Sequence, residues 1–323
     1  MVVALTLFKG EQTHQTPCMT NETVNDPRLT SLAASLPAAV PFVGPEAQER
    51  AKGASFKARL GANENVFGPS PAAIRAMRQA VKDVWMYADP ESRNLRMALA
   101  VHHVVNPDEI VIGAGIDGLL DSLVRLTVTE GTSVVTSAGA YPTFNYHVTG
   151  YGGTIHTVNY TADLEDPDHL VAKAREVGAK LIYLSNPDNP MGTHHTGATI
   201  QRMIESIPEG CLLVLDEAYL ELAPKGTAPA INTNDTRVIR LRTFSKGYGM
   251  AGARVGYALG HKALISSFNR VRNHFGMGRV SQVGALAALD DQAWLAEVCE
   301  KVEESRQRLY EIAEENGLVA SAA

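Results

Sequence analysis

Three short stretches of the sequence combine residue types that can do chemistry. In Thr-Phe-Ser-Lys-Gly at 243–247, the lone Lys246 follows an apolar segment among small residues, and Arg254 comes eight positions later. In Leu-Val-Leu-Asp at 213–216, the carboxylate of Asp216 directly ends an apolar run. Asn189 lies in a third stretch, Asn-Pro-Met-Gly at 189–192. Taken singly, these are typical of a solvated lysine, a helix N-cap and a turn.

Taken together, the three stretches match what pyridoxal 5′-phosphate (PLP) needs. This cofactor requires a lysine for a Schiff base, an acid that keeps its pyridine nitrogen protonated, and an anion site for its phosphate. Asp216 favours the charged pyridinium by direct Coulomb pairing. Desolvation and neighbouring positive charge lower the pKa of a lysine, so the amine of Lys246 can act as a nucleophile. Ser245 and Arg254 are donors of the kind that a phosphate prefers.

The elements that must position these residues alternate between short apolar strands and helices. We expect strands at 109–112, 133–136, 154–158, 181–184, 212–215 and 237–242, and helices at 119–127, 141–149, 167–177 and 199–207. A short helix is expected at 32–40 and a long one at 294–316, ended by Gly317. The alternation predicts an α/β fold with a mostly parallel sheet flanked by helices. Such sheets bind ligands at the carboxyl ends of their strands.

A glycine-rich turn at 113–118 matches G-x-G-x-x-G between a strand and a helix. A dinucleotide site also needs an acidic residue after the next strand, but Ser-Ala-Gly stands there at 137–139. The turn therefore predicts a site for a phosphate, which the free backbone N–H groups and the positive end of the helix dipole favour.

The order of these motifs resembles the fold-type I PLP-dependent aminotransferases, and within them the histidinol-phosphate aminotransferases. The likeness extends over about residues 60–316, and its most specific part is Asp-Glu-Ala-Tyr at 216–219 together with Ser-Lys at 245–246. The resemblance implies that Lys246 forms the Schiff base and moves a proton, and that Asp216 pairs with the pyridine nitrogen. It also implies that Asn189 and Tyr219 hydrogen-bond the phenolic oxygen of the cofactor.

Further roles follow from the same resemblance. Phe144 matches an aromatic residue that stacks on the pyridine ring, with Tyr141 as the second choice. Tyr87 matches a tyrosine that reaches the cofactor of the neighbouring subunit, which implies a homodimer. The phosphate is expected to be held by two side chains and two backbone N–H groups, those of Ser245, Arg254, Ile116 and Asp117. Alternatively, Phe144 and Tyr141 are core aromatics and Tyr87 packs beside Trp85.

The expected substrate-binding residues are Asn63 and Phe67, and here the sequence departs from the family pattern. Val66 and Phe67 stand where these enzymes often have Pro and Tyr, which removes one donor to a substrate phosphate. The family arginine that clamps the substrate anion would lie beyond Ala323, so Arg272 or Arg279 is considered as a substitute. No metal site is expected, because the adjacent histidines at 194–195 have no suitably spaced partners and are interpreted as solvated.

Length and composition set the remaining expectations. The chain has 323 residues, a net charge of −6, no basic block and no apolar run long enough to span a bilayer, which disfavours nucleic-acid and membrane partners. Three widely spaced cysteines are typical of a reduced compartment, so we expect a cytoplasmic protein. The expected division is a disordered extension at 1–30, a small-domain segment at 31–69, a large PLP-binding domain at 70–265 and a truncated small domain at 266–323. Translation is hypothesised to start at Met19 rather than Met1.

The resemblance implies transamination in histidine biosynthesis, by a histidinol-phosphate transaminase. The donor is an amine of the L-amino acid type, histidinol phosphate or an aromatic amino acid, and the acceptor is 2-oxoglutarate. Two alternatives stay open. One is a PLP-dependent decarboxylase or lyase of the same fold. The other is a catalytically impaired PLP-binding protein, because the region of the substrate arginine is absent.

Overall fold

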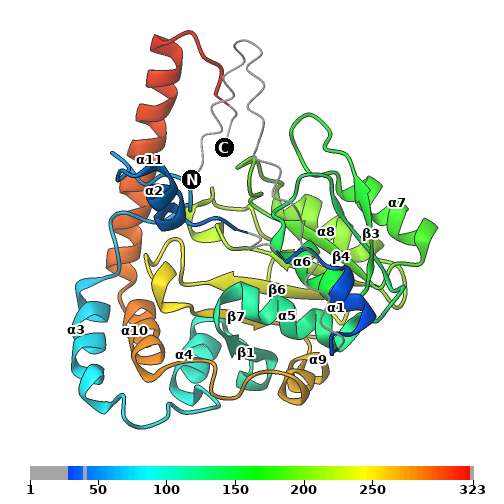
Figure 1. Ribbon diagram of the computed structural model, residues 1–323, viewed down its shortest axis with the longest axis horizontal. Coiled ribbons are helices and arrows are strands. Elements are labelled where there is room, and N and C mark those ends of the chain that lie inside the picture. The colour runs from blue at the N-terminus through cyan, green and yellow to red at the C-terminus, as the bar shows by residue number, and fades with distance from the viewer. Residues whose placement is uncertain (1–27, 39–41, 321–323) are drawn as a thin grey trace.

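One seven-stranded sheet forms the centre of the part of the chain that the structure, a computed structural model, describes: residues 28–38 and 42–320 (Figure 1). Across the sheet the strands lie in the order β1-β7-β6-β5-β4-β2-β3. Helices cover both faces, so the predicted α/β class is confirmed. The strands are β1 (Ile110–Gly113), β2 (Ser133–Ser137), β3 (Thr154–Val158), β4 (Leu181–Ser185), β5 (Leu212–Asp216), β6 (Val238–Thr243) and β7 (Gly256–Leu259).

The strands from β2 to β6 run parallel to their neighbours, whereas β7 is antiparallel to both β6 and β1. All six predicted strands are present, each displaced by no more than one residue. β7 was not predicted, because it has only four residues and follows a run rich in glycine and alanine that carries no strand signal. The parallel strands bring the ends of β4, β5 and β6 to one edge of the sheet.

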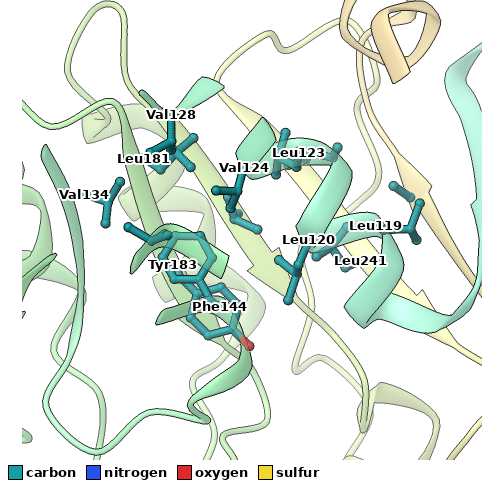
Figure 2. Close-up of a cluster of buried hydrophobic side chains, with 14 of the residues drawn as sticks. Leu119, Leu120, Leu123, Val124, Val128, Val134, Phe144, Leu181, Tyr183 and Leu241 are labelled. Atoms are coloured by element: carbon teal, nitrogen blue, oxygen red, sulfur yellow. The ribbon is translucent and has the colours of Figure 1, made fainter. Parts of the chain in front are cut away.

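The first face of the sheet is covered by α5 (Gly115–Thr127), α6 (Thr143–Gly150) and α9 (Lys262–Ser267). Alternate strand residues point to this side, as in β4, where Leu181 and Tyr183 pack with Phe144 of α6 (Figure 2). The rings of Phe144 and Tyr183 stack with their centroids 4.8 Å apart. Leu119, Leu120, Leu123 and Val124 of α5 continue this core toward β6 (Figure 2).

The second face is covered at one end by α7 (Pro167–Val177) and α8 (Gly197–Ser206). Ile182 and Leu184 of β4, which point away from the first face, are buried against these helices. Asp166 starts α7 by accepting a hydrogen bond from the backbone N–H of His169, and Thr196 starts α8 in the same way. Because both faces are buried, the strands read as continuous apolar runs.

The other end of the second face carries α3 (Pro71–Ala80), α4 (Arg93–His103), α10 (Arg279–Asp290) and the beginning of α11 (Gln292–Glu315). α3 packs on α10, where the absence of a side chain at Gly284 admits Met77. α11 rises away from the sheet (Figure 1) and ends before Gly317, at φ +66°, as predicted.

Two helices precede these, α1 (Ser31–Ser35) and α2 (Pro45–Lys52). The helix predicted at 32–40 is shorter than expected, since it ends at Ser35, and residues 39–41 lie outside the described part. The predictions about Met1, Met19 and most of the extension at 1–30 also lie outside the described residues. The predicted domain division stays a prediction. None of the described helices has the length and apolar character that a membrane crossing requires.

Candidate active site

The three chemistry-bearing stretches meet at the carboxyl ends of β4, β5 and β6. Ser185, the last residue of β4, pairs in register with Asp216, the last residue of β5, and Asp216 pairs with Leu241 of β6. The backbone N–H of Asn186 extends this pairing by donating to the Asp216 carbonyl at 2.8 Å. The turn of Asn189, the acid at 216 and the lysine after β6 therefore lie along one edge, as the sequence predicted.

Asp216 is a buried acid held by two donors. Its carboxylate accepts hydrogen bonds from the Tyr183 hydroxyl at 2.7 Å and from the backbone N–H of Ala218 at 2.9 Å. Burial raises the pKa of Asp216 to about 6, against the opposing effect of these hydrogen bonds and of the Lys246 charge. Asp216 is therefore ionised at neutral pH and able to pair with a buried cation.

Lys246 follows β6 and points back across the site. Its Nζ donates to the carbonyl oxygens of Ala62 at 3.4 Å and Asn63 at 3.3 Å, and lies 5.2 Å from the centre of the Tyr219 ring. Burial lowers the pKa of Lys246, although the charge of Asp216 opposes this. A partly desolvated amine with a lowered pKa is the form that reacts with a carbonyl group.

Asn63 and Tyr219 form a second pair beside the lysine. Asn63 Nδ2 donates to the Tyr219 hydroxyl at 2.8 Å, while Asn63 Oδ1 is buried without a hydrogen-bond partner. Burial raises the pKa of Tyr219 to about 12, so its hydroxyl stays neutral and can donate. Asn65 fixes this segment over the lysine, because its Nδ2 donates to the carbonyls of Lys246 and Gly247, both at 3.1 Å.

A cradle for an anion lies at the N-terminus of α5. A Cβ on Gly115, the first residue of α5, would collide with the guanidinium of Arg254, and one on Gly256 would come within 2.8 Å of the backbone N of Ile116. Arg254 Nη1 also donates to Ser245 Oγ at 3.2 Å. The first-turn N–H groups of Ile116 and Asp117 have no acceptor within the helix. Donors arranged in this way suit a phosphate, and the phosphate site itself stays a prediction.

A pocket opens beside these groups, and its lining contains Asn63, Asn189 and Tyr219. Arg306 of α11 also lines it and was not predicted. The sequence contains a signal for this residue. Arg306 lies on the same helix face as Val302 and Leu309, so a charged residue stands where the helical pattern calls for an apolar one. Arg306 forms an ion pair with Glu303 one turn away.

The structure places the two aromatic residues considered for stacking on the cofactor, Phe144 and Tyr141, in different surroundings. The structure does not present Phe144 as a stacking surface: its side chain is 0% exposed and is enclosed in the core beside Tyr183. In this structure α6 turns the Phe144 ring toward the sheet, and its role at the cofactor stays a prediction. Tyr141, the second choice, is 39% exposed and close enough to Tyr219 to affect its pKa.

Several predicted residues lie away from the pocket. The Phe67 ring faces the Lys301 ammonium of α11, at 5.6 Å, and is not part of the pocket lining. Tyr87 is 80% exposed, with its ring 4.7 Å from that of Phe275. Arg272 and Arg279 donate to the carbonyls of Pro90 and Tyr87, and neither is part of the pocket lining.

The interpretation of both histidines at 194–195 as solvated is wrong. His195 is half-buried, and its ring bonds the carbonyl of Glu165 at 2.7 Å. His194 lines the pocket, and burial together with the charge of Arg306 lowers its pKa. In the described part of the chain, no cluster of three or more His, Cys, Asp or Glu residues has a geometry for a metal ion.

One buried ion pair network was not predicted. Glu217, which follows Asp216, is 1% exposed and accepts from Arg240 at 2.6 Å and from Arg242 at 2.9 Å. The two arginines hold the pKa of Glu217 below its ordinary value despite burial. Glu217 therefore remains ionised and compensated directly beside the acid of the site.

Comparison with known proteins identifies the family. Residues 57–321 match the model of aminotransferase class I and II, so the chain belongs to this family. It is 36% identical over 276 residues to a histidinol-phosphate aminotransferase of Anaeromyxobacter sp., covering 84% of this chain and 75% of that one. A histidinol-phosphate aminotransferase of Bacillus velezensis is 34% identical, covering 80% of this chain and 73% of that one.

Solved structures agree. The histidinol-phosphate aminotransferase of Sinorhizobium meliloti, solved with pyridoxal 5′-phosphate, superposes with a TM-score of 0.88 at 49% identity, covering 91% of this chain and 80% of that one. A protein of Erwinia carotovora atroseptica superposes at 0.75 with 28% identity, covering 82% and 79%. The predicted fold-type I aminotransferase, and PLP as the cofactor of its family, are confirmed.

Proposed function

We propose that this protein transfers the amino group of histidinol phosphate to 2-oxoglutarate, as a step of histidine biosynthesis in the cytoplasm. The observation that carries the proposal is the meeting of Lys246 and Asp216 at adjoining strand ends, next to the anion cradle of Arg254. The names of the similar proteins support histidinol phosphate as the donor. The free thiols of Cys211 and Cys299 support a reducing compartment.

When bound, PLP supplies an electron-accepting ring for the chemistry at the α-carbon of the amine. Asp216, ionised at neutral pH, holds the proton on the ring nitrogen. Lys246 Nζ would hold the cofactor aldehyde, and its amine would move the proton at the substrate α-carbon. Burial lowers the pKa of Lys246, which favours the unprotonated amine.

The other residues bind and orient. Ser245, Arg254 and the N–H groups of Ile116 and Asp117 hold the phosphate of the cofactor. Tyr219 and Asn189 donate to its phenolic oxygen, and Tyr141 is proposed as the stacking aromatic in place of Phe144. Asn63 positions the Tyr219 hydroxyl. Arg306, with His194, places positive charge and a donor in the pocket for the anionic group of the amino donor.

We further propose a homodimer. A set of exposed apolar side chains lies near Tyr87 in the sequence, and the Phe275 ring joins it 4.7 Å from the Tyr87 ring. Its members are Val81, Val84, Trp85, Tyr87 and Phe275. Sedimentation velocity checks this: a Trp85→Glu variant is expected to shift the protein to monomers, and monomeric wild-type protein at high concentration contradicts the proposal.

Two experiments test the proposed reaction. Borohydride reduction of the PLP-loaded protein, followed by peptide mass analysis, should fix a pyridoxyl group on Lys246, and Lys246→Ala should abolish it. A panel of amino donors, including histidinol phosphate and aromatic amino acids, is then assayed with 2-oxoglutarate. Formation of glutamate with histidinol phosphate supports the proposal. Release of CO₂ or of an eliminated group indicates a decarboxylase or lyase, and a bound cofactor unaffected by every donor indicates an impaired enzyme.

A further inference from the structure

Two buried carboxyl groups face each other behind the turn that carries Asn189. Glu165 is 2% exposed and Asp188 is 5% exposed, and neither has a role in the reaction described above. Glu165 comes just before α7, and Asp188 directly precedes Asn189. Asp188 also contributes to the lining of the pocket.

Glu165 connects three segments. Its Oε2 accepts from Ser137 Oγ, at the end of β2, at 2.8 Å, and its Oε1 accepts from the backbone N–H of Ser185, at the end of β4, at 3.1 Å. Its carbonyl accepts from the His195 ring at 2.7 Å. The side chain of Glu165 therefore connects two strand ends, and its backbone carbonyl contacts the segment that follows the Asn189 turn.

Asp188 holds that turn from within. Its Oδ2 accepts from the Tyr160 hydroxyl at 2.9 Å and from the backbone N–H of Met191 at 3.4 Å. Its backbone N–H donates to the Thr193 carbonyl at 2.9 Å, and its carbonyl accepts from Gly192 at 3.1 Å. Asp188 Oδ1, however, is buried and receives no hydrogen bond.

One proton between the two carboxyl groups removes their repulsion and gives Asp188 Oδ1 a hydrogen-bond partner. Ionised carboxylates only accept hydrogen bonds, so two facing carboxylates repel each other and leave Oδ1 unsatisfied. If one group keeps its proton, it donates to the other, as aspartic-protease acid pairs do. Burial, followed by the charge of Asp188, raises the pKa of Glu165, and burial raises that of Asp188.

We propose that Glu165 and Asp188 share one proton at neutral pH, and that this bond holds the Asn189 turn in its place at the pocket. Both are positioning residues, because they act through Asn189. Loss of the proton leaves two like charges in a buried site, which displaces the turn and weakens cofactor binding. Only this last step depends on the proposed function.

The groups that surround the pair determine the choice of variants. Besides Ser137 and His195, the neighbours include three tyrosines whose pKa values the charge of Asp188 helps to raise: Tyr160, Tyr183 and Tyr219. Asp216 is the fourth neighbour and is hydrogen-bonded to Tyr183. Asp188→Asn leaves all of them in place. The amide introduced at position 188 can donate to Glu165 and accept from Tyr160. It therefore supplies, at every pH, the hydrogen bond that the shared proton supplies in the wild type.

The first test measures unfolding of the cofactor-free full chain by urea from about pH 5 to pH 9. Because the folded pKa is raised, the folded state binds more protons than the unfolded state above about pH 4.3, the ordinary pKa of Glu. Stability from the shared proton is therefore complete below that pH and falls as pH rises through the folded pKa, by about tenfold in the folding equilibrium per pH unit.

Asp188→Asn and Glu165→Gln should each remove this pH dependence. Asp235→Asn is the control: it is the same chemical change as Asp188→Asn, at a carboxyl whose pKa the Arg237 guanidinium holds below its ordinary value, and neither partner titrates in this range. It should keep the wild-type slope. Equal slopes in wild type and both pair variants overturn the proposal.

The second test measures PLP affinity at about pH 7 and pH 9. Wild-type affinity should fall more steeply than that of Asp188→Asn, whereas Asp188→Ala, which strands Tyr160, should bind about tenfold more weakly at both values. The infrared difference spectrum of wild type minus Glu165→Gln should contain the carbonyl band of a protonated acid, whereas the band of Glu221, whose pKa burial raises to about 7, is common to both proteins and cancels. If PLP does not bind at all, the proposed function fails, while the unfolding and infrared results still decide whether the proton is shared.

Discussion

The Tyr183 hydroxyl donates a 2.7 Å hydrogen bond to Asp216 Oδ2, and the Tyr183 ring stacks on Phe144 at 4.8 Å. The acid of the site is thus supported from the core by an aromatic pair that no solvent reaches. Phe144, expected to touch the cofactor, instead packs on Tyr183, whose hydroxyl holds Asp216.

Tyr183→Phe should raise the pKa of Asp216 further, because the hydrogen bond that favours its ionised form is lost while burial remains. Since Asp216 must be ionised to hold the pyridine proton, PLP affinity should decline as pH falls through about 6 in wild type. In the variant this decline should begin at higher pH. Titration with PLP across this range checks the shift, and identical profiles contradict the assignment.

Gly115→Ala should weaken PLP binding by about tenfold or more, because loss of a charge-assisted hydrogen bond costs about 1.5–3 kcal/mol. The new Cβ collides with the Arg254 guanidinium, and φ of +76° disfavours any side chain there. Gly118→Ala, one turn along α5, is the control and meets only Ala114 Cβ at 3.4 Å. Equal affinity of the two variants, measured by fluorescence titration, rejects the cradle.

Glu217→Gln should destabilise the fold by about 3–5 kcal/mol, because it leaves Arg240 and Arg242 buried without their counter-charge. Glu297→Gln, which breaks an exposed pair with Lys301 on α11, should cost about 0–1 kcal/mol. Urea unfolding of both variants gives the comparison. A small loss for Glu217→Gln means that the arginines find other compensation.

Arg306→Gln should raise KM for histidinol phosphate by about tenfold with little change in kcat, because a charge-assisted bond to the substrate anion is lost. KM for histidinol, which has no phosphate, should stay near its wild-type value. Arg308→Gln removes an exposed arginine of the same helix and should change neither. An equal rise for both donors assigns Arg306 a structural role.

The site was predictable where chemistry and strand ends coincide. Lys246, Asp216 and Asn189 each follow an apolar run, and a parallel sheet necessarily brings such ends together. Gly115 and Arg254 followed from the requirement of a phosphate. These inferences depended on chain order and residue type, both of which the sequence displays.

What escaped prediction depends on packing across long distances in the chain. Tyr183 reads as one more apolar strand residue until β5 places Asp216 beside it. Phe144 sits in a motif that suits the cofactor, yet the direction of α6 encloses it. Arg306 acts through the position of α11, and Glu165 meets Asp188 only once β3 and β4 are assembled. A single sequence does not show these long-range contacts.

The loop from Lys246 to Arg254 joins the two residues proposed to hold the aldehyde end and the phosphate end of the cofactor. Gly249 in the middle of this loop fits so closely against Gly68 that a side chain there would overlap the Gly68 carbonyl, and Trp294 donates to that same oxygen at 3.3 Å. These contacts connect the loop to the amino-terminal segment and to the beginning of α11. We therefore expect binding of the cofactor at this loop to affect the placement of the helix that bears Arg306.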